Sequence, residues 1–171
     1  MDNKDNDKFL VLNTGGTFNK IYNDITGELV VSKNNNFMIK SILKFSKIDR
    51  VTIKSIIHKD SLDMNKKDRK KIIKYIERSK SQYIIIIHGT DTMEKTAKFI
   101  NKHIKNKVII LTGAMVPYSI DKVEATANFS LAMGFLQGKK IKNDVYIAMH
   151  GKVKKYNKIY KNRELGIFEC H

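Results

Sequence analysis

Two short segments combine glycines with threonine hydroxyl groups in a spacing that suits nucleophilic chemistry. Residues 14–17 read Thr-Gly-Gly-Thr, and residues 88–97 read His-Gly-Thr-Asp-Thr-Met-Glu-Lys-Thr-Ala. Each segment directly follows an apolar run, at 9–12 and 83–87, that predicts a buried strand. Ligands bind at the carboxyl ends of the strands in open α/β sheets. Two threonines on two such loops therefore indicate one site with a hydroxyl nucleophile, as in hydrolases.

The loops after the other predicted strands also carry small or polar residues. In chain order these residues are Gly15, Gly16 and Thr17, then Asp60 and Ser61, then Gly89, Thr90 and Asp91, then Gly113 and Ala114, and last His150 and Gly151. Glycines allow backbone amides to approach a ligand closely, and the start of a following helix favours an anion such as a carboxylate. Because all these loops are expected at one sheet edge, we expect them to form a single site.

Each of these features also has a purely structural interpretation. Gly15 and Gly16 form a tight turn in that reading, and the segment lacks the Gly-Lys-Ser/Thr ending of a phosphate-binding loop. Asp91 with Glu94 three residues later fits a helix capping box. Ser61 or Asp63 fits the N-cap of the helix that follows. The coincidence of all these residues on one edge favours the functional interpretation.

The remaining pattern predicts a single α/β domain over residues 1–171, with a polar, flexible N-terminus at 1–8. Alternating strands and helices indicate a three-layer open parallel sheet. Strands are expected at 9–13, 51–57, 83–87, 108–111 and 145–149, and helices at 37–45, 64–79, from Met93 through Ile104, and at 121–137. A loop or hairpin is expected at 24–28, and a second hairpin in the tail around 163–168.

The formal charge of +16 does not predict a nucleic-acid partner. The basic residues are 29 lysines and only four arginines, and they accompany 24 isoleucines and 15 asparagines. Arginine, not lysine, makes the bidentate contacts that phosphates and bases favour. A+T-rich codons supply lysine, isoleucine and asparagine together. The charge therefore indicates a solvated basic surface.

The cysteine content and the apolar segments of the sequence bear on metal binding and on the cellular compartment. Cys170 is the single cysteine, which excludes an intramolecular disulfide and a cysteine metal cluster. The start of the chain has no apolar segment typical of a signal peptide, and no stretch approaches the roughly 18 apolar residues of a membrane span. We expect a cytoplasmic protein without a membrane partner.

The two threonine segments resemble the signature segments of the bacterial-type L-asparaginases. Residues 113–115 with Pro117, and Asn128 followed by Ala132, resemble the next loop and helix of that family. The resemblance spans nearly the whole chain but corresponds only to the family's larger N-terminal domain. The closing residues 162–166 resemble a short-chain branch that has only this domain. The resemblance implies a flavodoxin-like fold with the active site at the carboxyl ends of the strands.

The implied activity is hydrolysis of L-asparagine to L-aspartate and ammonia. Alternatives are hydrolysis of a related amide, such as glutamine or an asparaginyl peptide, and a binding module with little turnover. Thr17 matches the family's nucleophile, which forms an acyl-enzyme, and Tyr22 resembles the tyrosine that orients it. Thr90, Asp91 and Lys139 match a second cluster, in which the carboxylate holds the lysine and the lysine activates the threonine or a water molecule. Lys140 is the alternative to Lys139.

The resemblance also implies the substrate contacts. Ser61 and Asp91 would hold the α-carboxylate and α-amino groups, and the Gly16 and Thr90 loops would approach the amide. The amide of Thr90 would stabilise the oxyanion, and the carbonyl of Ala114 would face the leaving group. Longer relatives have glutamine where this chain has Leu62, which cannot hydrogen-bond an amino group, and Asp60 just before Ser61 would supply a charge for that group instead. No metal or organic cofactor is implied, and we expect a homodimer or a tetramer.

Overall fold

A mostly parallel sheet forms the centre of the computed structural model, which describes residues 8–33 and 36–171. Residues 1–7 of the N-terminus that was expected to be flexible therefore lie outside the described residues. The strand order is β4-β1-β5-β6-β7-β8. The bounds are β4 (Val51–Lys59), β1 (Phe9–Gly15), β5 (Tyr83–Ile87), β6 (Val108–Thr112), β7 (Asp144–Met149) and β8 (Lys152–Lys155).

The parallel part of the sheet confirms the predicted fold class. Neighbours from β4 to β7 pair in parallel, and only β8 runs antiparallel, against β7. Counted along the chain, the parallel strands have the order 2-1-3-4-5 of flavodoxin-like sheets. The connections from β1 to β4 and from β4 to β5 lead to opposite sides of β1, so the switch point of the sheet lies beside β1. The carboxyl ends of β1, β4 and β5 therefore meet where such sheets bind ligands.

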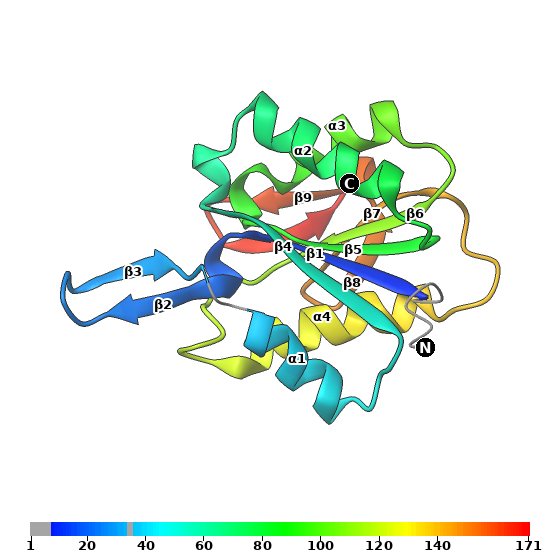
Figure 1. Cartoon of the computed structure of the whole chain (residues 1–171). Helices are drawn as coiled ribbons and strands as arrows, with labels where there is room; N and C mark the ends of the chain where they lie inside the picture. Colours follow the sequence, from blue (N-terminus) through cyan, green and yellow to red (C-terminus); the bar gives the residue numbers. More distant parts are fainter. Residues whose placement is uncertain (1–7, 34–35) are drawn as a thin grey trace.

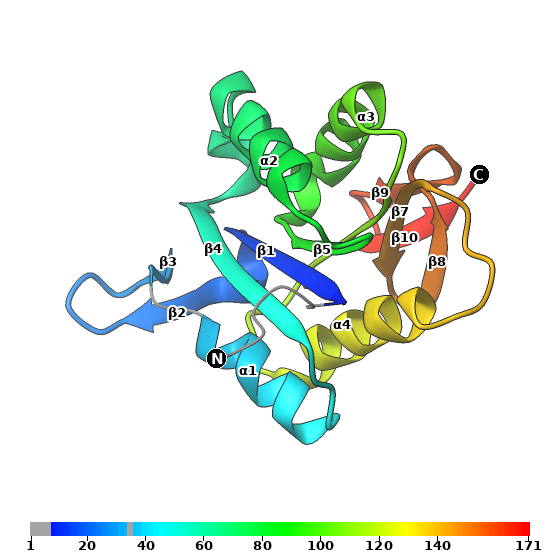
Figure 2. The ribbon, with the colours of Figure 1, turned by 45° about the vertical axis from the view of Figure 1, so that its right-hand side comes forward.

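Four helices cover the two faces of the sheet (Figure 1). The helices α2 (Lys66–Arg78) and α3 (Met93–His103) lie on one face, and α1 (Asn36–Phe45) and α4 (Lys122–Leu136) lie on the other, as Figure 2 shows from a second side. Within the described residues, no helix has the length and apolar character of a membrane span.

The alternation of side chains along each strand produces two cores. On β1, Leu10 and Leu12 pack under α2 and α3, whereas Phe9 and Val11 pack under α1 and α4. The apolar run of β5 divides in the same way between the two faces. Because both faces are covered, the central strands are continuously apolar, as predicted for a parallel sheet.

Helix α2 begins at a capping box that the sequence analysis did not identify. The Asn65 side chain accepts hydrogen bonds from the amides of Lys67 and Asp68, and the Asp68 carboxylate accepts one from the Asn65 amide. The expectation that Ser61 or Asp63 caps this helix is therefore wrong. Ser61 instead begins a short 3-10 turn, η2 (Ser61–Asp63), which lies just after β4 at the carboxyl edge of the sheet.

Two hairpins stand outside the central sheet. The predicted turn at 24–28 lies in the hairpin of β2 (Lys20–Asn23) and β3 (Glu28–Val31), which projects from the body of the molecule (Figure 1). The predicted tail hairpin is formed by β9 (Ile159–Asn162) and β10 (Ile167–Cys170). Its fully buried residues Ile159 and Phe168 join the core beneath α3. The edge strand β8 was not predicted.

Candidate functional site

Three loops meet at the carboxyl edge through direct backbone contact. The amide of Gly16 donates to the carbonyl of Lys59 at the end of β4, 2.9 Å away. A Cβ atom on Gly16 would overlap the backbone of Gly89, and one on Gly89 would lie 2.8 Å from the Ser61 hydroxyl oxygen. Gly16 also has a φ of 75°, which side chains rarely adopt. Both glycines are therefore required for the loops to approach this closely.

The two threonines of the predicted site lie on these adjacent loops. Thr17 begins the 3-10 turn η1 (Thr17–Asn19) and is half-buried. Thr90 begins η3 (Thr90–Thr92) and is buried. The Thr14 hydroxyl donates to the carbonyl of Ile87 over 2.7 Å and ties the first loop to the end of β5. The structure thus brings together the two hydroxyl-bearing segments, 73 residues apart in the chain.

Lys161, on the tail hairpin, completes the group around Thr90. Its Nζ donates to the Thr90 hydroxyl oxygen over 2.9 Å and to Asp91 Oδ1 over 2.8 Å. The Lys161 side chain is only 10% exposed, so solvent screens its ion pair with Asp91 weakly. A lysine, a carboxylate and a threonine hydroxyl are therefore in direct contact at the sheet edge.

The structure does not bring Lys139 to this group, and that prediction is wrong. Lys139 and Lys140 follow the end of α4 and are exposed. Helix α4 leaves the carboxyl end of β6 and returns to the start of β7, so its last residues lie at the opposite edge of the sheet. The period-2 pattern of the tail places Lys161 on the same strand face as the buried Ile159, but it does not show which residues the lysine contacts.

Asp91 binds the tail and does not cap a helix. Arg163 donates to Asp91 Oδ1 over 3.1 Å and to the Asp91 carbonyl over 2.9 Å. The caps of η3 and α3 are Gly89 and Thr92, and neither makes a side-chain capping bond. Glu94 accepts from the Lys161 amide instead of closing a capping box. The capping box that Asp91 and Glu94 were expected to form is therefore absent from the described residues.

Ser61 is buried and fixed against the β5 loop. Its hydroxyl oxygen accepts from the Thr92 amide over 3.3 Å, and its carbonyl accepts from the Thr92 hydroxyl over 2.8 Å. The buried guanidinium of Arg69 donates to the Thr92 hydroxyl, to the Thr96 hydroxyl and to the Met64 carbonyl. Arg69 thus links η2 to η3 from behind the site.

Asp60 forms an ion pair with Lys20. Its Oδ2 lies 2.8 Å from Lys20 Nζ, and its Oδ1 accepts from the Leu62 amide. Burial raises the pKa of Asp60, but the bonds from Lys20 and the Leu62 amide outweigh it and lower the pKa below its usual value. The carboxylate is therefore charged and balanced by Lys20. Leu62 itself is 66% exposed.

Two further predicted residues lie at the rim and in the core. Tyr22 lies on the projecting β2–β3 hairpin and is 65% exposed. Among the described residues it makes no hydrogen bond to Thr17. Ala114 follows β6 and is buried. The adjacent carbonyl of Gly113 accepts from Asn128 Nδ2 over 3.0 Å, while Asn128 Oδ1 accepts from the His150 amide. Asn128 therefore fixes the loops after β6 and β7.

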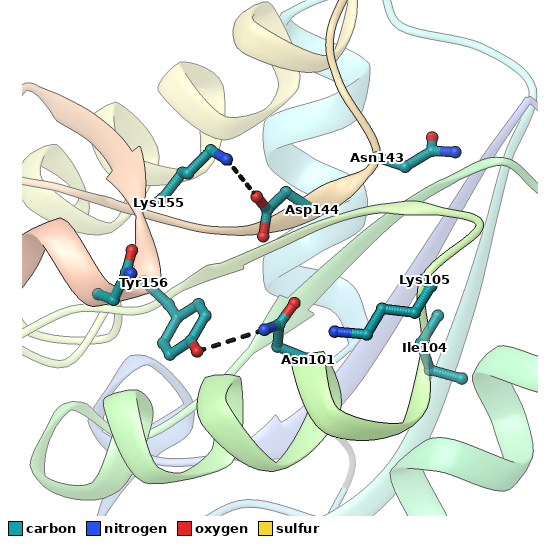
Figure 3. A pocket seen from close by; sticks show the side chains of 8 residues that line it. Asn101, Ile104, Lys105, Asn143, Asp144, Lys155 and Tyr156 are labelled. Carbon is teal, nitrogen blue, oxygen red and sulfur yellow. Dashed lines mark hydrogen bonds and ion pairs between the residues drawn. The ribbon is translucent and has the colours of Figure 1, made fainter.

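A hollow lies at the amino-terminal edge of the sheet, away from the candidate site. It encloses about 260 Å³ between the end of α3 and the start of β7. Figure 3 shows the Asp144–Lys155 ion pair and the hydrogen bond from Asn101 to the Tyr156 hydroxyl in its wall. None of the residues predicted for catalysis lines it.

Together these features define the class of protein: an open α/β protein with a threonine-bearing candidate site at the switch point of its sheet. A family model described as "Asparaginase, N-terminal" matches residues 8–167. The chain therefore belongs to the asparaginase family.

Individual relatives agree with this family. The chain is 26% identical to the L-asparaginase of Thermococcus kodakarensis over 164 residues, covering 94% of this chain and 49% of that protein. It is 29% identical to a probable periplasmic L-asparaginase of Haemophilus influenzae over 155 residues, covering 84% and 43%. The chain thus spans about half the length of the curated relatives it matches.

Solved structures give the same result. The thermostable L-asparaginase from Thermococcus kodakarensis matches with a TM-score of 0.77 and 25% identity, over 95% of this chain and 50% of that chain. A probable cytoplasmic L-asparaginase from Campylobacter jejuni matches with a TM-score of 0.78 and 26% identity, over 96% and 53%. The fold described above therefore corresponds to about half of each of these solved chains.

His88, between β5 and Gly89, is buried without charge. Its Nδ1 lies 2.7 Å from the Gly89 carbonyl, which only accepts, so Nδ1 carries the proton. Burial lowers the pKa of His88 from 6.5 to about 4, chiefly because a charged ring would lose its hydration. The neutral ring holds the Gly89 carbonyl in place behind the site.

This burial predicts acid sensitivity of the fold. The unfolded chain takes up a proton on His88 near pH 6.5, but the folded chain does so only near pH 4. The free energy of unfolding should therefore fall as the pH drops through this window, by about 2 kcal/mol from about pH 7 to about pH 5. His88→Gln should lose this part of the dependence. Urea unfolding at both pH values measures it, and an equal decrease in both proteins would contradict the assignment.

Proposed function

We propose that this chain hydrolyses the side-chain amide of L-asparagine to L-aspartate and ammonia. The observation that carries the proposal is the contact of Lys161 Nζ with the Thr90 hydroxyl and Asp91, on the loop that abuts Gly16 and Thr17. Membership of the asparaginase family supports the substrate. The named L-asparaginases that the chain resembles support it further.

In the proposed reaction Thr17 is the nucleophile. Its hydroxyl oxygen attacks the amide carbon, its proton passes to an acceptor, and ammonia leaves after the nitrogen has gained a proton. A threonine hydroxyl is too weak an acid to react unaided, so a neighbouring group must take the proton. We propose that Tyr22 orients the Thr17 hydroxyl, which requires the β2–β3 hairpin to close over the site. Water then attacks the acyl-enzyme and releases L-aspartate.

The second cluster would act on protons. Lys161 donates a hydrogen bond to the Thr90 hydroxyl oxygen, which leaves the Thr90 proton free to be shared with a substrate or a water molecule. The carboxylate of Asp91 holds the lysine in place. We therefore assign the role that was expected of Lys139 to Lys161, with Thr90 as the hydroxyl group that it activates.

Substrate binding would use the same loops. We assign the α-carboxylate to the Ser61 hydroxyl and the α-amino group to the Asp91 carboxylate. Arg163 already occupies one oxygen of Asp91, so an incoming ammonium must share that oxygen or use the other. The amide of Thr90 is proposed for the oxyanion, and the carbonyl of Ala114 for the leaving group.

The nucleophile assignment has a direct test. Thr17→Ala should abolish ammonia release from L-asparagine, because the covalent route is lost, while circular dichroism and thermal unfolding stay near those of the wild type. Thr90→Val should be similarly damaging. If Thr17→Ala keeps more than about a tenth of the wild-type rate, the assignment is wrong, because the loss of a covalent route costs several kcal/mol of barrier.

The lysine assignment is tested by a matched pair. Lys161→Met should lower kcat about 100-fold or more, the usual effect of removing a general acid or base. Lys139→Met removes the same charge from the opposite edge and should leave kcat within about twofold, as expected for an exposed lysine. Ammonia release measures both, with L-glutamine as a second substrate. Equal effects of the two substitutions would contradict the reassignment.

Assembly and location are also proposals. Acyl-enzyme chemistry benefits from a closed site, whereas Thr17 is only half-buried and Tyr22 is exposed. We therefore propose a homodimer or tetramer that covers them. Light scattering during turnover tests this, and a fully active species near 19.8 kDa would contradict it. We propose a cytoplasmic location, in line with the named Campylobacter relative and unlike the Haemophilus one.

A further inference from the structure

The position of Lys161 depends on how the β9–β10 hairpin is held. This hairpin is a two-stranded sheet of its own and shares no ladder with the central sheet. Two-stranded hairpins are marginally stable by themselves. Lys161 therefore stays beside Thr90 and Asp91 only if other contacts anchor its strand.

Two such anchors lie at a single cross-strand pair. Lys161 pairs with Phe168 across the hairpin. The Lys161 amide donates to Glu94 Oε1 over 2.9 Å, and the Phe168 amide donates to His150 Nδ1 over 3.1 Å. Both amides thus point out of the hairpin, and each binds a side chain of the body. The hairpin is fastened on both sides at the residue that carries the site lysine.

His150 is held for this task by Glu124. Because His150 Nδ1 accepts from an amide, it carries no proton, and the proton lies on Nε2. Nε2 then donates to Glu124 Oε1 over 3.0 Å. The carboxylate also accepts from the amides of Met115 and Val116, both over 2.9 Å. Glu124 therefore joins the β6 loop, His150 and, through His150, the hairpin.

The backbone at His150 is unfavourable for a histidine. His150 and Gly151 form the two-residue turn between β7 and β8, with φ values of 50° and 75°. Glycine and asparagine are the residues that such turns favour at both positions. The histidine side chain also meets the Phe168 ring edge-on, with centroids 5.9 Å apart. Its contacts with Glu124 and Phe168 offset a conformation that glycine would adopt without strain.

We propose that His150, oriented by Glu124, is a positioning residue that holds Lys161 against Thr90 and Asp91. His150 touches neither Thr90 nor Asp91 in the described structure, so it acts through Phe168 and the hairpin. The consequence for turnover rests on the proposed function. The consequence for the position of Lys161 does not.

The test removes the side chain without straining the turn. His150→Gly suits the left-handed backbone and deletes both hydrogen bonds. Lys47→Gly is the matched control, since Lys47 is exposed and has a φ of 52°. His150→Gln is the rescue variant, because its amide oxygen and nitrogen can replace Nδ1 and Nε2. All three are made in the full chain.

Three readouts are compared between the variants. In His150→Gly the Phe168 amide should exchange with deuterium at least about tenfold faster, since its acceptor is gone. The NMR signals of the Lys161 side chain, identified with Lys161→Met, should shift. For L-asparagine, kcat should fall at least about tenfold with KM changed less than about threefold, because misplacement of a reacting group costs this much or more. Lys47→Gly should match the wild type, and His150→Gln should recover part of each loss.

The outcomes separate the two proposals. If the wild type releases no ammonia from any amide, the proposed function fails, and the exchange rate and the Lys161 signals still decide the anchoring. Unchanged Lys161 signals in His150→Gly would overturn the positioning role. So would an unchanged kcat in an active wild type. A kcat loss that His150→Gln does not relieve at all would also overturn it.

Discussion

The structure depends on backbone contact between loops at one edge of a parallel sheet. Gly16 lies against Gly89, and Gly89 lies against Ser61, with no space for a Cβ atom on either glycine. Because the strands are parallel, their carboxyl ends share this edge, and the short turns after them can stack directly. Segments from β1, β4 and β5 thereby form one surface. Each threonine of the site has its place because a glycine precedes it.

Buried polar groups keep this edge rigid. Arg69 is buried and donates to three neutral oxygens, and burial lowers its pKa because the charge has lost water. His88 is buried without charge. Such groups destabilise a fold unless they are hydrogen-bonded, so the three bonds of Arg69 and the bond from His88 Nδ1 to the Gly89 carbonyl have to stay intact. The site loops consequently rest on a layer that tolerates little rearrangement.

The tail supplies the cation of the site from outside the central sheet. Lys161 and Arg163 both reach Asp91, and Glu94 and His150 hold the hairpin that carries them. The net charge of the chain does not explain these contacts. Most lysines are solvated, whereas the Lys161 side chain is nearly buried against a carboxylate. A basic composition and a specific lysine are therefore separate features of this protein.

The sequence by itself determined the layers, the five parallel strands and the two threonine loops, because these follow from local hydrophobic period and from glycines beside hydroxyl residues. Only the tertiary structure decided which lysine joins Thr90. Lys139 is close in the chain to the helix of the resemblance, but α4 carries it to the far edge of the sheet. Lys161 arrives through a hairpin whose position depends on long-range contacts with Glu94 and His150, and no local pattern encodes those contacts. The role of Asp91 was also decided only by the tertiary structure. An aspartate followed three residues later by a glutamate fits a capping box, and the sequence does not show that Lys161 is the partner of this aspartate.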